Sequence, residues 1–178
     1  MMPRSLSRFR SPSLRYRGFT LIEVMIAIVV LAFGLLALAG LQLQMLRFSQ
    51  SASLRTIATA EAASLADHVL SNRAGLDANY YDLSAPPTTT TAVAACMTAT
   101  GCSGQEIART ALAIWSQNLL DLLGPGAGGI ICIDSTPADG TLAAPACDHS
   151  ANAPYVIKIW WKDERNGNVG QFVTSFQP

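Results

Sequence analysis

The sequence has few charged residues, and those it has are separated by sign. Charged residues make up only 13% of the 178 positions, and half of the chain is apolar, which is little charge for a wholly soluble protein. The first 18 positions contain no acidic residue but hold five of the 12 basic ones. The rest of the chain has seven basic and 12 acidic residues, a formal net charge of −5. Nucleic acid is therefore not an expected partner, because its binding depends on basic contacts to phosphates.

Residues that hold metals or perform catalysis are also scarce. The chain has two histidines and four cysteines, and it lacks a Cys-x-x-Cys pair, so we expect no zinc site. His149 lies between Asp148 and Ser150, but neighbours in sequence do not by themselves form a nucleophile–base–orienter triad. His68 is interpreted as a solvated side chain. We predict that the protein is not an enzyme and uses no cofactor.

One long segment lacks charge altogether. No charged or strongly polar residue occurs from Val24 to Leu41. As a helix this run would rise about 27 Å, and extension to Leu46 gives about 35 Å, enough to cross a hydrocarbon core of about 30 Å. Basic residues mark the preceding segment as cytoplasmic; they are Arg4, Arg8, Arg10, Arg15 and Arg17. An ordinary secretory signal is cut after its apolar run, whereas the small residue Gly18 precedes this one, so the apolar helix would stay on the mature protein.

Glu23 lies at the start of this apolar segment. An unpaired carboxylate deep in a bilayer costs roughly 2.5–3.5 kcal/mol on insertion scales. A cut between Gly18 and Phe19 would create an α-ammonium four residues before Glu23, on the same helix face, and the helix dipole favours a carboxylate in the first turn. In an assembly of parallel helices, the same carboxylate could meet a neighbour's amine. The alternative is a simple membrane anchor whose acid lies in the headgroup region.

The run Arg17-Gly18-Phe19-Thr20-Leu21-Ile22-Glu23 resembles the type III signal of type IV pilins and pseudopilins. The resemblance implies that prepilin peptidase, which is also the N-methyltransferase, removes residues 1–18 as a basic leader and methylates Phe19. Glu23 would neutralise the amino terminus of a neighbouring subunit during assembly. Residues 19–46 would form a transmembrane and assembly helix in the inner membrane, packed in the pilus against other minor and major pilins. Residues 47–178 would form the amphipathic half of the helix and a periplasmic globular head.

The four cysteines, Cys96, Cys102, Cys132 and Cys147, favour disulfides. An even number beyond a membrane segment is typical of an oxidising compartment. Three pairings are possible, and we prefer Cys96–Cys102 with Cys132–Cys147 because each closes a short loop rich in turn residues.

The helical pattern continues beyond the apolar segment. An apolar stripe with three- and four-residue spacing predicts one helix from Phe19 to Arg73; the stripe consists of Leu54, Ile57, Ala58, Ala62, Leu65 and Val69. The residues 72–75 supply a stop signal. An irregular surface connection is predicted from Tyr80 to Gly104. The Ser103–Glu106 spacing then predicts a capping box and a second helix that ends at Gly124. Its expected buried face consists of Ala108, Ala111, Leu112, Trp115, Leu119 and Leu122.

The carboxyl-terminal third predicts a small antiparallel sheet. The glycine-rich residues 124–129 are interpreted as a flexible turn, since they lack the Lys-Ser/Thr ending of a phosphate loop. Strands are predicted at 130–133, 155–162 and 169–176, the last two joined by a turn at Asn166–Gly167. One of Trp160 and Trp161 must point away from the core face, either as a subunit contact or beneath a loop. The predicted fold is α+β and type IV pilin-like: a long helix with a protruding hydrophobic half under an antiparallel sheet with one extra helix.

Later segments narrow the resemblance. A resemblance to the PilV group of minor pilins is carried by three segments, residues 114–124, 128–132 and 155–161. It implies a subunit of the type IV pilus that acts in a priming complex at or near the tip. One alternative is a minor pseudopilin of a type II secretion system, because it carries the same signal. The other is a membrane-anchored binding or adhesion domain that does not polymerise.

Overall fold

The structure is a computed structural model that describes residues 18–88, 91–99, 101–162 and 168–178. The predicted leader up to residue 17 and the predicted turn at Asn166–Gly167 lie outside the described residues. The chain divides into two compact units, Met1–Leu46 and Arg47–Pro178.

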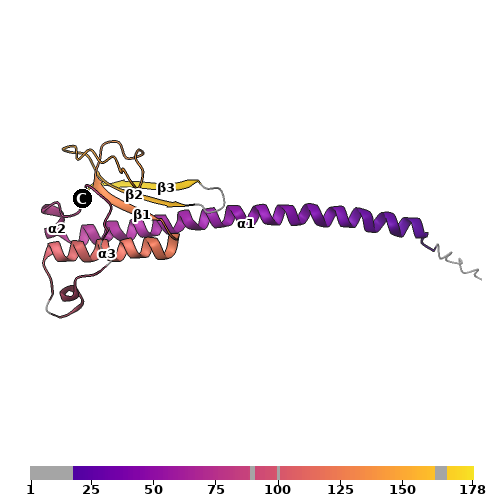
Figure 1. The fold of residues 1–178 in the computed structure, drawn as a ribbon, viewed down its shortest axis with the longest axis horizontal. Coiled ribbons are helices and arrows are strands. Elements are labelled where there is room, and N and C mark those ends of the chain that lie inside the picture. The colour runs from indigo at the N-terminus through magenta and orange to yellow at the C-terminus, as the bar shows by residue number, and fades with distance from the viewer. Residues whose placement is uncertain (1–17, 89–90, 100, 163–167) are drawn as a thin grey trace, which may run out of the picture. The chain divides into compact units, whose positions relative to one another are not determined.

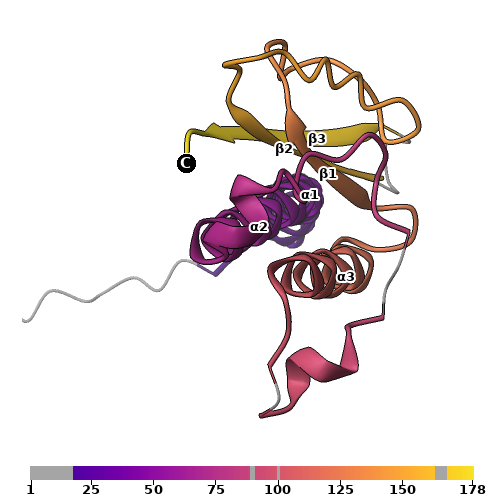
Figure 2. The same cartoon turned by 90° about the vertical axis from the view of Figure 1, so that its left-hand side faces the viewer.

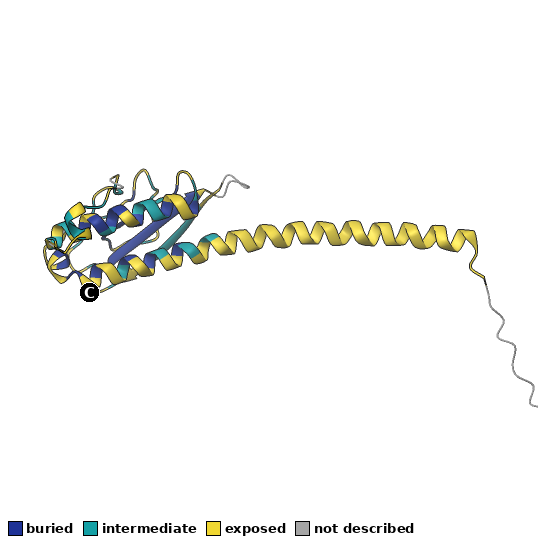
Figure 3. Cartoon of the chain, turned by 90° about the horizontal axis from the view of Figure 1, so that it is seen from below, coloured by how far each residue is buried: buried dark blue, intermediate teal, exposed yellow. Residues whose placement is uncertain are grey.

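The longest element is helix α1, Leu21–Ser71, with 51 residues (Figure 1). In the first unit its side chains are exposed all round (Figure 3). In the second unit α1 buries one stripe, formed by Ala58, Ala62, Leu65 and Val69. These positions share a helix face because they are three or four residues apart. The predicted stripe is thus confirmed, with Leu54 and Ile57 packed at its border.

The chain leaves α1 at Asn72, as the stop signal predicted, but forms a second short helix at once. Helix α2 spans Arg73–Asp77, and the Asn72 Oδ1 caps it by accepting from the Gly75 N–H at 3.1 Å. The Asn72 Nδ2 donates to the Tyr81 hydroxyl at 2.9 Å and to the Gly104 carbonyl at 2.7 Å. Gly75 is therefore not a helix terminator but a buried residue of α2, packed so closely that a Cβ would collide with the Asn72 side chain.

The connection after α2 is less irregular than predicted. The Tyr81 side chain is completely buried, so the prediction of a surface segment is wrong there. Burial raises the pKa of the Tyr81 hydroxyl, against the opposing hydrogen bond from Asn72. A 3₁₀ helix, η1, covers Ala94–Met97.

Helix α3 spans Gly104–Leu123 and begins with the predicted capping box. The Glu106 N–H donates to Ser103 Oγ at 3.3 Å, and the Ser103 N–H donates to the Glu106 carboxylate at 2.8 Å. Gly124 ends the helix with a φ of 93°, a value that favours glycine. The predicted buried face is correct at Ala108, Leu112, Trp115 and Leu119, but Ala111 is only partly buried. Leu122 is 49% exposed and Leu123 is buried instead, because Leu123 lies one full turn after the buried Leu119.

The sheet has three antiparallel strands in the order β1-β2-β3. Strand β1 spans Gly128–Ile133, β2 spans Tyr155–Lys162 and β3 spans Val169–Phe176. Their register places Ile131 opposite Ile157, and Ile157 opposite Thr174.

Gly128 and Gly129 belong to β1, so the predicted glycine-rich turn is shorter than expected. Close packing against helix α3 explains why a glycine lies in this strand. A Cβ on Gly129 would lie 2.5 Å from Cη2 of Trp115, and only glycine lets strand and helix approach so closely.

Both faces of the sheet are covered in the second unit. Helix α3 and the last turns of α1 lie on one face (Figure 2), over the β2 side chains of Tyr155, Ile157, Ile159 and Trp161. On the other face Trp160 packs with Ile130 and Cys132, beneath the residues 134–154. Trp160 and Trp161 are only 3% and 6% exposed. The loop-packing alternative is therefore right, and the exposed-tryptophan contact is wrong.

The predicted α+β class, with a long amino-terminal helix and a small antiparallel sheet, is confirmed. The prediction of one extra helix is too simple, because α2 and η1 occur in addition to α3.

Candidate functional site

The start of the described chain is accessible. Gly18, Phe19 and Thr20 precede α1 without regular secondary structure. The Phe19 side chain is 82% exposed, and nothing lies within 4 Å of the place where Gly18 would carry a Cβ. An exposed segment outside a helix is the conformation that a peptidase can bind, because its backbone groups are not engaged in a helix.

Thr20 positions Glu23 at the helix start. The Thr20 carbonyl accepts from the N–H groups of Glu23 at 3.1 Å and Val24 at 3.3 Å, and its Oγ1 accepts from the Glu23 N–H at 3.4 Å. Thr20 thus acts as the helix cap, and Glu23 lies in the first turn of α1. None of the ion pairs among the described residues involves Glu23, so within those residues its carboxylate has no cation.

Helix α1 is, by length and composition, the one helix among the described residues that could cross a membrane. Its large apolar side chains from Leu21 to Phe48 are exposed in the isolated chain. A helix that is apolar all round suits lipid or a bundle of like helices. The apolar segment therefore fits membrane anchoring.

Two disulfides stabilise the second unit. Cys96 is joined to Cys102, and Cys132 to Cys147, which is the pairing that the short loops favoured. Asp134 lies close to Cys132 and Cys147, and this trio has the residue types of a metal site. Zinc needs cysteine as a free thiolate, and both sulfur atoms are committed to the disulfide, so the trio is not a metal centre.

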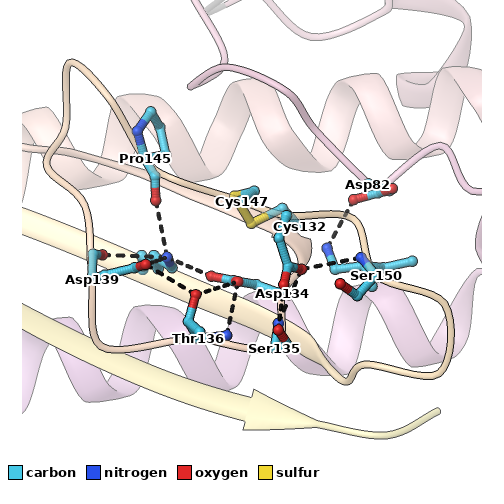
Figure 4. Close-up of polar contacts among 12 residues, drawn as sticks. Asp82, Cys132, Asp134, Ser135, Thr136, Asp139, Pro145, Cys147 and Ser150 are labelled. Carbon is cyan, nitrogen blue, oxygen red and sulfur yellow. Dashed lines mark hydrogen bonds and ion pairs between the residues drawn. A yellow bond between two sulfur atoms is a disulfide. The ribbon is translucent and has the colours of Figure 1, made fainter.

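Asp134 and Asp139, both labelled in Figure 4, bind a buried cation. The Lys158 side chain is fully buried, and its Nζ lies 2.5 Å from Asp134 Oδ2 and 2.9 Å from Asp139 Oδ1. It also donates to the Pro145 carbonyl at 2.9 Å. Burial alone would lower the pKa of Lys158, but the hydrogen bonds to Asp134 and Asp139 outweigh it and raise that pKa. The same contact with Lys158 lowers the pKa of Asp139.

The sequence alone does not reveal this cluster. Strand alternation puts Lys158 on the face opposite Ile157 and Ile159, where a lysine normally reaches water. The available signal was a lysine in mid-strand together with two aspartates in the loop after the preceding strand. In the structure that loop folds over the sheet, so Lys158 binds the loop rather than solvent.

His149 forms an ion pair with an aspartate. His149 Nδ1 lies 2.8 Å from Asp82 Oδ1, and the same oxygen accepts from the Ile133 N–H at 2.8 Å. Asp148 accepts instead from the Ser135 hydroxyl, which lowers the pKa of Asp148. No hydroxyl group binds His149 among the described residues, so the pair lacks a nucleophile. Its evident effect is to hold the segment around Asp82 against β1.

Comparison with known proteins identifies the amino-terminal segment. Residues 13–39 match the family model described as the prokaryotic N-terminal methylation motif. No curated protein and no solved structure matches the chain. The matched residues include Gly18, Phe19, Glu23 and the first turns of α1, so the resemblance to a type IV prepilin signal is confirmed. The motif supports a type IV pilin-like protein, and it implies processing by prepilin peptidase and assembly with other pilins.

Proposed function

We propose that this protein is a minor pilin of the type IV pilus. Residues 1–18 are removed, Phe19 is methylated, and the mature chain spans the inner membrane once with its head in the periplasm. It then joins other pilins in a complex that primes pilus assembly at or near the tip. The observation that carries this proposal is the methylation motif over residues 13–39, followed by a helix with Glu23 in its first turn and no further charged residue before Arg47.

The proposed assembly step is electrostatic. Removal of the leader creates an ammonium group at Phe19 inside an apolar environment. Glu23 is the acid in the first turn of α1, and pairing it with the Phe19 ammonium of an adjacent subunit neutralises both charges. An unpaired carboxylate there carries the insertion cost of roughly 2.5–3.5 kcal/mol. The pairing therefore favours association and sets the axial register between parallel helices.

The head supports an extracytoplasmic location. Its two disulfides are typical of an oxidising compartment such as the periplasm. The positive-inside rule gives the same orientation, because the basic residues of the leader precede the apolar segment.

The direct test replaces Glu23 by alanine in the full chain. We expect E23A to insert in the membrane but to be absent from sheared pili. The matched control is E61A, which removes an acid from the same helix but in the second unit, and it should be incorporated normally. Incorporation of E23A at the wild-type level would favour the membrane-anchored domain that does not polymerise.

Two further measurements complete the test. Mass spectrometry of the purified protein should show a chain that begins at methylated Phe19; a mature chain that retains its arginines would contradict the proposal. Deletion of the gene should abolish surface pili and twitching. Loss of exported enzymes with normal pili would instead indicate the pseudopilin alternative.

A further inference from the structure

The two edges of the sheet differ in how their backbone groups are satisfied. The outer edge of β1 is covered. Its Ile131 carbonyl accepts from the Leu83 N–H at 3.1 Å, and its Ile133 carbonyl accepts from the His149 N–H at 3.0 Å. The Ile133 N–H donates to Asp82 at 2.8 Å. Segments distant in sequence thus close this edge.

The outer edge of β3 has no such cover. Apart from the ladder with β2, no hydrogen bond among the described residues involves the backbone of Val169–Phe176. In an edge strand, alternate N–H and C=O groups point away from the sheet. Burial agrees with an open edge: seven of the eight β2 residues are buried, whereas β3 has none.

The sequence of β3 also lacks the usual protection of an edge. Native edge strands are kept from pairing by charged residues, proline, bulges or shortness. The β3 sequence VGQFVTSF contains no charge and no proline, and its eight residues exceed the usual length of about five or six. The edge of β3 therefore presents unpaired backbone groups without the features that usually protect them.

We propose that the outer edge of β3 binds an extended strand from a different pilin subunit, which extends the sheet between the two heads. Backbone N–H and C=O groups are the chemistry that such an edge recognises. On the core face, Phe172 and Phe176 border the added strand, and on the other face Val169 is 62% exposed. Apolar side chains in the added strand would contact both.

The closed β1 edge limits this interaction to one partner. Each head of this kind can accept an added strand at one edge alone, so sheet extension cannot continue through successive heads. The interaction therefore produces a small complex rather than a polymer. A pair of identical chains would use the open edge of both and leave none for other subunits. The choice of a different subunit therefore rests on the proposed role in a priming complex.

The test is hydrogen exchange of the full chain in detergent, alone and co-expressed with a second subunit that carries the same methylation motif. In the complex, we expect amides of Val169–Phe176 to exchange at least tenfold more slowly. Amides of α3 serve as the internal reference and should not change. Co-purification without protection of β3 would overturn this inference and leave the proposed function standing.

Edge variants give the second readout. V169K combined with S175K places two charges on exposed positions of the edge, and it should reduce co-purification at least tenfold. The control L122K makes an equivalent change on the exposed surface of α3 and should have no effect. Equal recovery of the edge variant would overturn the inference. Slow exchange of the β3 amides in a dimer of this chain alone would also overturn the inference, because the occupant of the edge would then be a second copy. Failure of the wild-type chain both to co-purify and to enter pili would contradict the proposed function as well.

Discussion

Replacement of Lys158 by methionine should destabilise the head severely. Methionine fills similar volume, but it leaves the carboxylate of Asp134 without its cation. Both side chains of the pair are fully buried. Removal of one partner from a buried ion pair typically costs about 3–5 kcal/mol, because the remaining charge is neither paired nor hydrated. For a domain of this size, that loss corresponds to a melting temperature roughly 10–20 °C lower.

Tryptophan fluorescence provides the assay for this variant. All three tryptophans, Trp115, Trp160 and Trp161, are buried in the second unit, so their emission reports unfolding of that unit and not of the apolar half of α1. Urea unfolding of the full chain in detergent, compared between wild type and K158M, gives the difference in free energy of unfolding. The matched control is K162M, which removes an exposed lysine from the same strand and should change that free energy by less than about 0.5 kcal/mol.

A loss below about 1 kcal/mol in K158M would refute the reasoning, since such a value is typical of a surface ion pair. Equal destabilisation by K158M and K162M would refute it too, because the effect would then not depend on burial. The double variant K158M/D134L removes both charges and should recover most of the lost stability.

Three further predictions concern the same unit. G129A should lower the free energy of unfolding by about 1–3 kcal/mol, because the new Cβ would lie 2.5 Å from Trp115; urea unfolding followed by fluorescence measures it, and an unchanged midpoint would show that the helix can move away. Joint replacement of Cys132 and Cys147 by serine opens a crosslink with a sequence separation of 15 and should cost about 3 kcal/mol in the same assay, whereas a loss near zero would mean that the loop is held without it. The lowered pKa of Asp139 contributes stability that is complete above the ordinary value of 3.8 and is lost as the pH falls through the lower pKa of the folded state. Urea midpoints measured from about pH 5 to pH 3 should therefore fall less steeply in D139N than in wild type, and parallel curves would contradict this assignment.

The amino-terminal segment could be predicted because its evidence is local. Charge, residue order and the length of the apolar run are all read within the first 46 residues, and they indicated the motif that residues 13–39 match. The capping box at Ser103 and the alternation of β2 are equally local, since each depends on residues within one element.

Other features were missed because residues distant in sequence decide them. Gly129 was assigned to a flexible turn, but it lies in β1 because Trp115 packs against it. Tyr81 was assigned to a surface connection, but it is buried with its hydroxyl bound to Asn72. Neither contact leaves a periodic signal.

The sequence by itself determined the long apolar helix, the amino-terminal methylation motif, the order of the strands along the chain and the α+β class. These follow from the spacing of apolar residues and from the cost of charge in lipid, which are properties of neighbouring residues. Only the tertiary structure decided that Lys158 is a buried partner of two aspartates and that one edge of the sheet is closed while the other is open. Lys158 meets Pro145 and Asp139 across 13 and 19 residues, and Asp82 meets Ile133 across 51. Such contacts exist only once the loops have folded over the sheet, because burial and backbone pairing depend on what lies nearby in space.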